Sequence, residues 1–141
     1  MDLSLKTRKE VGALGESVAA HYLTRHGMQI IDRNVARKTG ELDVIAREED
    51  TLHFVEVKSI LCTEFPHFAP ETGASRGEPD DFDQYDPSVN LHQYKIKKVA
   101  RTAEWYVAEH NWEGDWQIDG CLVWLRVHDG MAHVTYLPQI V

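Results

Sequence analysis

The sequence predicts a single α/β domain whose elements run helix, three strands, helix and two strands. Two long stretches, residues 7–26 and 90–110, repeat apolar side chains at the spacing of one helix face. Five shorter stretches alternate in polarity or are bounded by turn residues: 28–33, 41–47, 52–59, 117–127 and 131–137. Asp129-Gly130, between the last two, is a strong hairpin signal. A chain of 141 residues can bury the core of one such domain without staples.

The first helix has local signals at both ends. Thr7 and Glu10 stand in the positions of a capping box, with Thr7 as the N-cap and Glu10 reaching back to it. Gly27 suits the position just after the last turn, where the backbone becomes left-handed. The face that we expect to be buried consists of small and apolar side chains: Val11, Leu14, Gly15, Val18, Ala19 and Tyr22.

Two glycines and a glutamate in this helix need a physical reason. Gly12 and Gly15 each cost about 1 kcal/mol relative to alanine inside a helix, so we expect close packing against another element or an open approach to a ligand. Glu16 lies at the flank of the buried face, on the side of Gly12 and Leu23. From the helix alone, an ordinary carboxylate at the boundary of the core is the favoured interpretation.

Residues 41–47 and 52–59 form a central strand pair joined by a charged turn, Glu48-Glu49-Asp50. Because side chains alternate along a strand, Glu56 and Lys58 continue the face that begins with Leu52 and Phe54. Asp43 likewise stands within an apolar strand. Ionised groups in such surroundings are costly unless they are paired or bound to a metal ion.

These residue types suit metal-assisted chemistry on phosphate esters. Asp43 and Glu56 supply the hard oxygen ligands that Mg²⁺ prefers, and the main-chain carbonyl of Val57 can add another. Lys58 projects to the same side as Glu56, where it can hold or deprotonate an attacking water and stabilise developing charge. The motif alone is weakly specific, and by itself it favours a surface ion pair between Glu56 and Lys58.

The formal charge of −8 is unevenly distributed. Residues 61–90 hold seven acidic residues and one basic residue, so the rest of the chain is close to neutral at −2 and can still present a basic surface. Residues 61–88 also contain four of the five prolines and no periodicity, which indicates a long acidic insert. A solvated insertion is the favoured interpretation; the alternatives are a lid, a segment that docks a protein partner, or an acidic flap over the site.

Membrane and export signals are missing from the sequence. No apolar run approaches the length of a membrane span, and the N-terminal residues lack the apolar core of a signal peptide. Cys62 and Cys121 have no paired spacing for zinc. We therefore expect a reduced, cytoplasmic setting and no membrane partner.

The second helix carries a cluster of positive charge. Asn90 is the expected N-cap, and the expected buried face comprises Ile96, Val99, Ala100, Ala103, Tyr106 and Val107. Four cations fall within seven residues: Lys95, Lys97, Lys98 and Arg101. A solvated helix face is the favoured interpretation for most of them. The functional alternative is contact with nucleic-acid phosphates, with Lys95 as the first choice, followed by Lys98 and Arg101.

Several short blocks together resemble one family. They are Gly12, Gly15-Glu16, Tyr22-Leu23, Gly27, Arg33-Asn34, the stretch 40–45, the stretch 54–58, Lys95, Ala103 and Tyr106-Val107. In these residues the chain resembles the YraN-type family of bacterial proteins assigned as endonucleases. The resemblance covers most of the chain apart from the insert. It implies a restriction-endonuclease-like PD-(D/E)XK core, a mixed sheet flanked by helices, similar to that of archaeal Holliday-junction resolvases.

The resemblance also implies roles for individual residues. Asp43 matches the first acid of the motif, Glu56 the second acid, and Lys58 the motif lysine. Glu16 matches the first-helix carboxylate that assists metal binding in resolvase-like members. The expected catalytic residues are therefore these four, and the expected metal ligands are Asp43, Glu56, the Val57 carbonyl and Glu16. Asp119 is taken as structural, and no histidine is assigned to catalysis.

The function that follows is a Mg²⁺- or Mn²⁺-dependent endonuclease that hydrolyses phosphodiester bonds of DNA, with branched or structured DNA as an expected substrate. A symmetric cut at a junction would require a homodimer. The alternative from another class is a non-catalytic module that keeps the nuclease fold and binds nucleic acid through the second helix or a protein partner through the acidic insert. A protein-interaction adaptor is a third interpretation, and it predicts no salt-dependent binding of nucleic acid.

Overall fold

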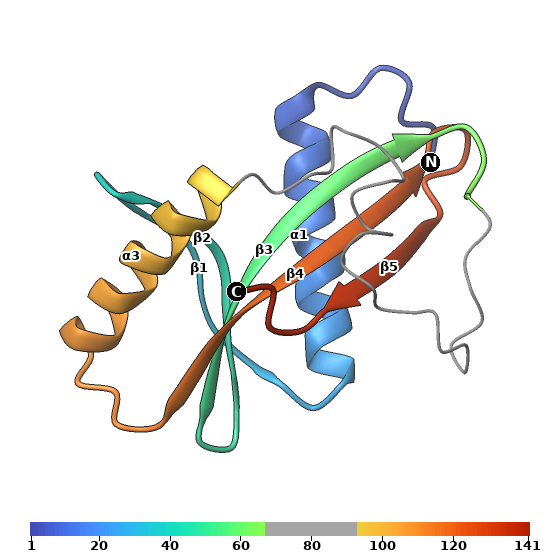
Figure 1. Cartoon of the computed structure of the whole chain (residues 1–141). Helices are drawn as coiled ribbons and strands as arrows, with labels where there is room; N and C mark the ends of the chain where they lie inside the picture. Colours follow the sequence, from blue (N-terminus) through green and yellow to red (C-terminus); the bar gives the residue numbers. More distant parts are fainter. Residues whose placement is uncertain (67–92) are drawn as a thin grey trace.

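The computed structural model describes residues 1–66 and 93–141, with side chains in the second range from residue 96 onward. Its elements are α1 (Arg8–Arg25), β1 (Gln29–Arg37), β2 (Gly40–Glu48), β3 (Thr51–Cys62), α3 (Gln93–Glu109), β4 (Asp115–Arg126) and β5 (Ala132–Leu137). The strands form one sheet in the order β1-β2-β3-β4-β5, parallel between β3 and β4 and antiparallel elsewhere. The predicted element order and the restriction-endonuclease-like topology are confirmed (Figure 1).

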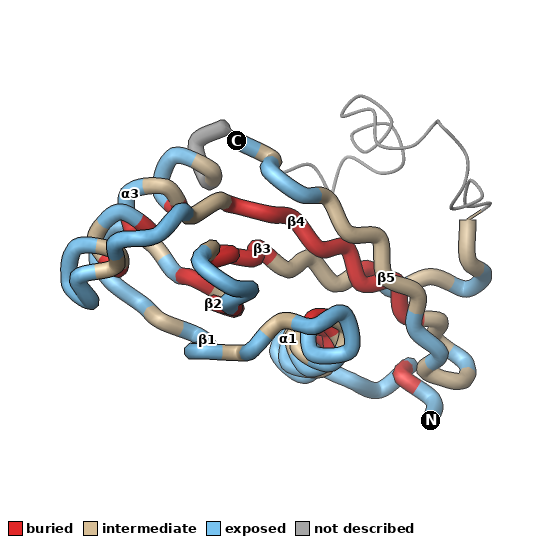
Figure 2. The backbone as a smooth tube through the Cα atoms, turned by 90° about the horizontal axis from the view of Figure 1, so that it is seen from below, coloured by how far each residue is buried: buried red, intermediate tan, exposed pale blue. Residues whose placement is uncertain are grey.

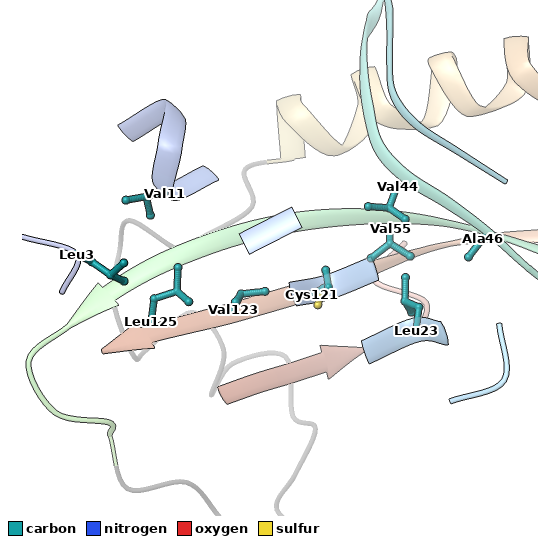
Figure 3. Close-up of a cluster of buried hydrophobic side chains, with 10 residues drawn as sticks. Leu3, Val11, Leu23, Val44, Ala46, Val55, Cys121, Val123 and Leu125 are labelled. Atoms are coloured by element: carbon teal, nitrogen blue, oxygen red, sulfur yellow. The ribbon is translucent and has the colours of Figure 1, made fainter. Parts of the chain in front are cut away.

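The sheet has a helix on each face. α1 runs behind β3 and β4 in Figure 1, and the tube in Figure 2 shows the buried central strands passing over it. The cluster on the α1 face contains Leu3, Val11, Ala19, Leu23, Val44, Ala46, Val55, Cys121, Val123 and Leu125 (Figure 3). The cluster on the α3 face contains Leu42, Ile45, Leu52, Phe54, Val99, Ala103, Tyr106 and Ile118. Alternating β3 residues fall into different clusters, as the predicted faces require.

The predicted ends of α1 are confirmed. Thr7 N donates to Glu10 Oε1 at 2.9 Å and Glu10 N donates to Thr7 Oγ1 at 3.1 Å, which completes the capping box. Gly27 follows the helix with a φ of +89°, a conformation that favours glycine. The expected buried face was incomplete, because Leu23, placed at its flank, is fully buried in the core.

The two glycines of α1 have different surroundings. A Cβ added at Gly15 would lie 1.7 Å from the hydroxyl oxygen of Ser59 and 2.9 Å from its Cβ, so α1 and β3 approach closely at this point. A Cβ added at Gly12 would meet nothing within 4 Å. Of the two expected reasons, close packing therefore explains Gly15, and open space surrounds Gly12.

Two strands are longer than their sequence patterns indicated. β1 continues to Arg37 because residues 33–37 pair with β2, although the sequence pattern ended this strand at residue 33. β3 continues to Cys62 because it stays paired with β4 as far as Arg126. The predicted insert therefore starts too early, since residues 61 and 62 belong to a strand. Residues 67–88 of the insert and the expected N-cap Asn90 lie outside the described residues.

No helix in the described ranges is long and apolar enough to cross a membrane.

Candidate nuclease site at the split of the sheet

β2 and β3 separate partway along their length. Their antiparallel ladder runs from Glu48 and Thr51 to Val44 and Val55 and ends there. Beyond this point residues 40–42 of β2 still pair with β1, and β3 still pairs with β4. The β1–β2 hairpin therefore diverges from β3, as Figure 1 shows. Strands that part in this way leave backbone groups on their facing edges that need other partners.

Asp43 supplies one of these partners. It is the first β2 residue beyond the ladder, and its Oδ2 accepts a hydrogen bond from the Val57 amide at 2.9 Å. The carboxylate of Asp43 thus reaches across the gap to the β3 backbone, one residue from Glu56. An N–H donor to a carboxylate is a charge-assisted hydrogen bond that fixes the orientation of the acid.

Glu56 and Lys58 stand on the other side of the gap. Glu56 is 4% exposed and follows Phe54 on the α3 face of β3, where Lys58 is half-buried two residues further on. The predicted face shared by Phe54, Glu56 and Lys58 agrees with the core clusters, since Leu52 and Phe54 face α3 while Val55 and Val57 face α1. The sheet thus holds the Asp43 carboxylate at the Val57 amide, and Glu56 and Lys58 flank Val57 along β3.

The donor set suits a small hard cation. Two carboxylates and one main-chain carbonyl are the kind of partial coordination that Mg²⁺ accepts, because it keeps several waters and binds substrate phosphate oxygens. Within the described residues no group of three or more acidic, histidine or cysteine side chains is arranged to hold a metal ion. The roles of Asp43, Glu56 and the Val57 carbonyl as metal ligands stay predictions.

Glu16 lies on the α1 side of the same region. Burial raises the pKa of this carboxyl above its ordinary value, while a hydrogen bond from Asn34 and the charge of Arg33 act in the opposite direction and Glu41 adds to the increase. Its neighbours therefore come from β1 and β2. Gly15, the preceding residue, rests on Ser59 of β3. Its contacts place Glu16 at the border of the split, and its part in metal binding remains a prediction.

The cations of α3 are placed only in part. Lys97, Lys98 and Arg101 are exposed, and Gly40 of β2 packs against Lys98, because a Cβ there would lie 3.3 Å from the Lys98 Cβ. Lys95 belongs to α3, but its side chain lies outside the described part of the structure. Binding of nucleic acid by Lys95, Lys98 and Arg101 stays a prediction.

A known protein family matches the part of the chain that contains the split of the sheet. The model of the uncharacterised protein family UPF0102 matches residues 15–123. The chain belongs to UPF0102. The matched residues run from Gly15 in α1 to Val123 in β4, so they include every residue assigned above to the split of the sheet.

Individual UPF0102 relatives agree with this assignment. A UPF0102 protein of Treponema pallidum is 48% identical over 103 residues, which cover 73% of this chain and 67% of the relative. One of Syntrophotalea carbinolica is 37% identical over 102 residues, 72% of this chain and 68% of the relative. One of Campylobacter fetus is 32% identical over 108 residues, 77% of this chain and 78% of the relative. The sequence resemblance is thus supported as membership of UPF0102.

This UPF0102 chain also contains a buried polar network that the sequence did not indicate. Asp119 is 0% exposed, and its carboxylate accepts from His53 Nδ1 at 2.7 Å, Gln117 Nε2 at 2.8 Å and Gln139 N at 2.8 Å. The Tyr136 hydroxyl donates to the same carboxylate. Burial is the main reason that the pKa of Tyr136 is strongly raised, and this hydrogen bond is the second. The assignment of Asp119 as structural agrees with these contacts.

The network lies on the α1 face, away from Glu56. Tyr136 stacks on Tyr22 near the end of α1, with ring centroids 5.8 Å apart. No spacing in the sequence could have revealed it, because His53, Asp119 and Tyr136 come from three different strands. The single available signal was an aspartate and a histidine inside otherwise apolar strands.

Proposed function

We propose that this protein is a metal-dependent nuclease that hydrolyses phosphodiester bonds, with DNA as its substrate. The observation that carries the proposal is the hydrogen bond from the Val57 amide to Asp43 at the split of the sheet, which puts one carboxylate beside the backbone of buried Glu56. The resemblance to the YraN-type family and its PD-(D/E)XK core supports the same activity. DNA is preferred because the resolvases that resemble this core act on DNA.

Each residue has a distinct task in this proposal. Asp43, Glu56 and the Val57 carbonyl would hold Mg²⁺ or Mn²⁺, and Glu16 would assist through water or a second metal ion. When bound, the ion supplies positive charge that polarises the phosphate and stabilises the negative charge that develops there. Lys58 orients the attacking water and takes its proton while the water oxygen bonds to phosphorus. The bond from phosphorus to the departing oxygen of the phosphodiester breaks, and that oxygen takes up a proton. Lys58 is half-buried, which limits the motion of its side chain and supports this role.

The activity is tested by incubating the protein with supercoiled plasmid, linear duplex, a four-way DNA junction and single-stranded RNA. Mg²⁺, Mn²⁺ or EDTA is added in parallel. We expect cleavage of DNA with either metal ion and none with EDTA. Lys58→Ala and Asp43→Asn should each lower the rate by about 10²-fold or more, since the first removes the positive charge beside the reacting phosphate and the second removes a charged ligand of the metal ion. Lys6→Ala, at an exposed lysine before α1, is the matched control and should cleave normally.

A second readout does not depend on cleavage. Titration of the wild-type protein with Mn²⁺, followed by electron paramagnetic resonance, should show binding that Glu56→Gln weakens by about tenfold or more. Asp43→Asn keeps an oxygen that can accept from the Val57 amide, so it removes the charge with little change in the fold. Thermal melting of each variant verifies this.

The outcomes separate the functional classes. DNA binding without cleavage under every condition would identify a non-catalytic module and overturn the proposal. Absence of any salt-dependent binding of nucleic acid would instead indicate a protein-interaction adaptor. Cleavage that Lys58→Ala leaves unchanged would place the chemistry elsewhere in the molecule.

A further inference from the structure

Positive charge is concentrated in two short segments of an acidic chain. Residues 33–40 contain Arg33, Arg37 and Lys38 and no acidic residue, and residues 93–103 contain four cations and no acidic residue. Together they hold seven of the fifteen lysines and arginines of the chain. Only the second segment was considered for nucleic-acid binding from the sequence.

The fold brings these segments together. The two-residue turn Lys38-Thr39 joins β1 to β2, and the Thr39 and Thr102 hydroxyls are hydrogen-bonded at 2.7 Å. Thr102 is fully buried and also donates to the Lys98 carbonyl at 3.0 Å. A Cβ at Gly40 would lie 3.3 Å from both the Lys98 Cβ and the Thr102 hydroxyl oxygen. The turn therefore lies directly on α3.

Aromatic side chains help to fix this arrangement. The Arg37 guanidinium lies over the Trp105 ring, 3.9 Å from its centroid. Arg37 Nη1 also donates to the Ala36 carbonyl at 2.9 Å. The two contacts orient the guanidinium, and its remaining N–H groups can bind an anion. At the opposite end of β2, next to the β2–β3 turn, the Arg47 guanidinium lies 4.9 Å from the centroid of the Trp112 ring, which follows α3. Both tryptophans are half-buried against the α3-face cluster.

We propose that the turn and α3 form one binding surface for the phosphate backbone of a double-stranded nucleic acid. This hairpin–helix surface consists of Arg37, Lys38, Lys97, Lys98 and Arg101, which are all exposed. The inference rests on the proposed nuclease function and adds a second arm, the β1–β2 turn, to the helix cations. It also specifies a duplex.

Two features favour a duplex over a single strand. Cations on two separate elements suit phosphates that are held in a regular array, and such contacts require no base recognition. Proteins that bind single strands use open aromatic faces on which bases stack. In the hairpin–helix surface the Trp105 ring lies under a guanidinium and against the core instead.

The surface is also next to the split of the sheet. Gly40, which contacts Lys98, is three residues from Asp43 on the same strand. Three residues of extended chain span about 10 Å. A phosphate bound near Lys98 therefore places its neighbouring phosphates within reach of Asp43 and Glu56, so one backbone can occupy both.

Three double variants test the surface, and each removes one arginine and one lysine. Arg37→Gln/Lys38→Gln changes the turn and Lys98→Gln/Arg101→Gln changes α3. Arg8→Gln/Lys9→Gln changes exposed cations at the start of α1 and is the control. Binding of a fluorescein-labelled DNA duplex of about 30 base pairs and of one of its strands is measured by anisotropy in EDTA, over about 50 to 300 mM salt.

We expect the turn and α3 variants each to raise the Kd for duplex about tenfold at the lowest salt. A plot of the logarithm of the association constant against the logarithm of the salt concentration has a negative slope. Each variant should make this slope less steep by about 2, because two phosphate contacts are lost. The control should change neither value by more than about twofold. If the turn variant melts at a lower temperature, Lys38→Gln alone, at an exposed turn position, should still lower the slope by about 1.

The inference is overturned if the turn variant behaves like the control, if the single strand binds more tightly than the duplex, or if polyglutamate competes as well as DNA. Absence of duplex binding by the wild-type protein overturns it as well. These results are independent of cleavage. Binding that follows this pattern in a protein that never cuts DNA would retain the surface and remove the nuclease. If instead the turn variant binds and cleaves DNA as the wild type does, the nuclease is retained and the binding surface is removed.

Discussion

The close approach of α1 to β3 makes a sharp prediction about its two glycines. In Gly15→Ala the new Cβ would lie 1.7 Å from the Ser59 hydroxyl oxygen and 2.9 Å from the Ser59 Cβ. Rotation of the hydroxyl relieves the first contact, but the Cβ of Ser59 is fixed to the strand, so α1 has to move away from the sheet. Overpacking of this kind costs about 1–3 kcal/mol.

The magnitude follows by comparison with Gly12→Ala. Alanine favours a helix over glycine by about 1 kcal/mol at either position. At Gly12 nothing lies within 4 Å of the new Cβ, so the free energy of unfolding should rise by about 0.5–1 kcal/mol. At Gly15 the 2.9 Å contact with the Ser59 Cβ places the overpacking cost in the upper part of its range, about 2–3 kcal/mol. This exceeds the gain of about 1 kcal/mol, so the free energy of unfolding should fall by about 1–2 kcal/mol. The same chemical change, one turn apart, should therefore have opposite signs.

Urea unfolding followed by circular dichroism measures both variants, and a double-mutant cycle identifies the cause. If the contact with Ser59 is responsible, Gly15→Ala combined with Ser59→Gly should be more stable than the sum of the single changes by about 1 kcal/mol or more. Equal effects at Gly12 and Gly15, or additive effects in the cycle, would refute the close approach of α1 to β3.

Three further predictions concern buried titratable groups. Asp119→Ala removes the acceptor of four hydrogen bonds and should lower the free energy of unfolding by about 4 kcal/mol. The isosteric Asp119→Asn keeps one acceptor oxygen and should cost less than half as much; equal losses in urea titrations would contradict this. Burial raises the pKa of Glu16, so the folded protein holds this proton to a higher pH than the unfolded chain does, and ionisation destabilises the fold. Glu16→Gln should therefore gain stability relative to the wild type as the pH rises from about 4.5 to 7, and a difference independent of pH would rule out this effect. Burial raises the pKa of Cys121 to about 12. A thiol reagent at pH about 8 should therefore modify only half-exposed Cys62 in the native protein, and both cysteines in denaturant. Rapid modification of two thiols in the native protein would show that Cys121 is accessible.

Local signals in the sequence predicted the element order well. The capping box at Thr7 and Glu10 formed as expected because both partners lie within one helical turn. The alternation from Leu52 to Lys58 predicted the faces of β3 because the period of a strand does not depend on what packs against it. These features need no knowledge of distant contacts, and for that reason sequence patterns reveal them.

Features that depend on distant pairing were beyond the sequence. β3 extends to Cys62 because β4, more than fifty residues later, pairs with it throughout. The carboxylate of Asp119 is satisfied by groups from β3, β4 and the C-terminal residues. Lys38 and Lys98 become neighbours through the hydrogen bond between Thr39 and Thr102. In each case the sequence offered residues of the right chemistry but no information on which of them meet.

One arrangement of strands gives rise to both proposed sites. β1 and β2 remain paired up to Arg37 and Gly40, and their turn rests on α3, whereas β3 remains with β4. β2 and β3 must therefore part, and the Val57 amide loses its place in their ladder. Asp43 restores a partner for that amide, so an acidic side chain is held in the gap for structural reasons. The contact between the turn and α3 also brings the α3 cation Lys98 to the start of the strand that carries this acid. The proposed site for phosphodiester chemistry and the proposed surface for phosphate binding therefore have a common structural cause, the divergence of the β1–β2 hairpin from β3.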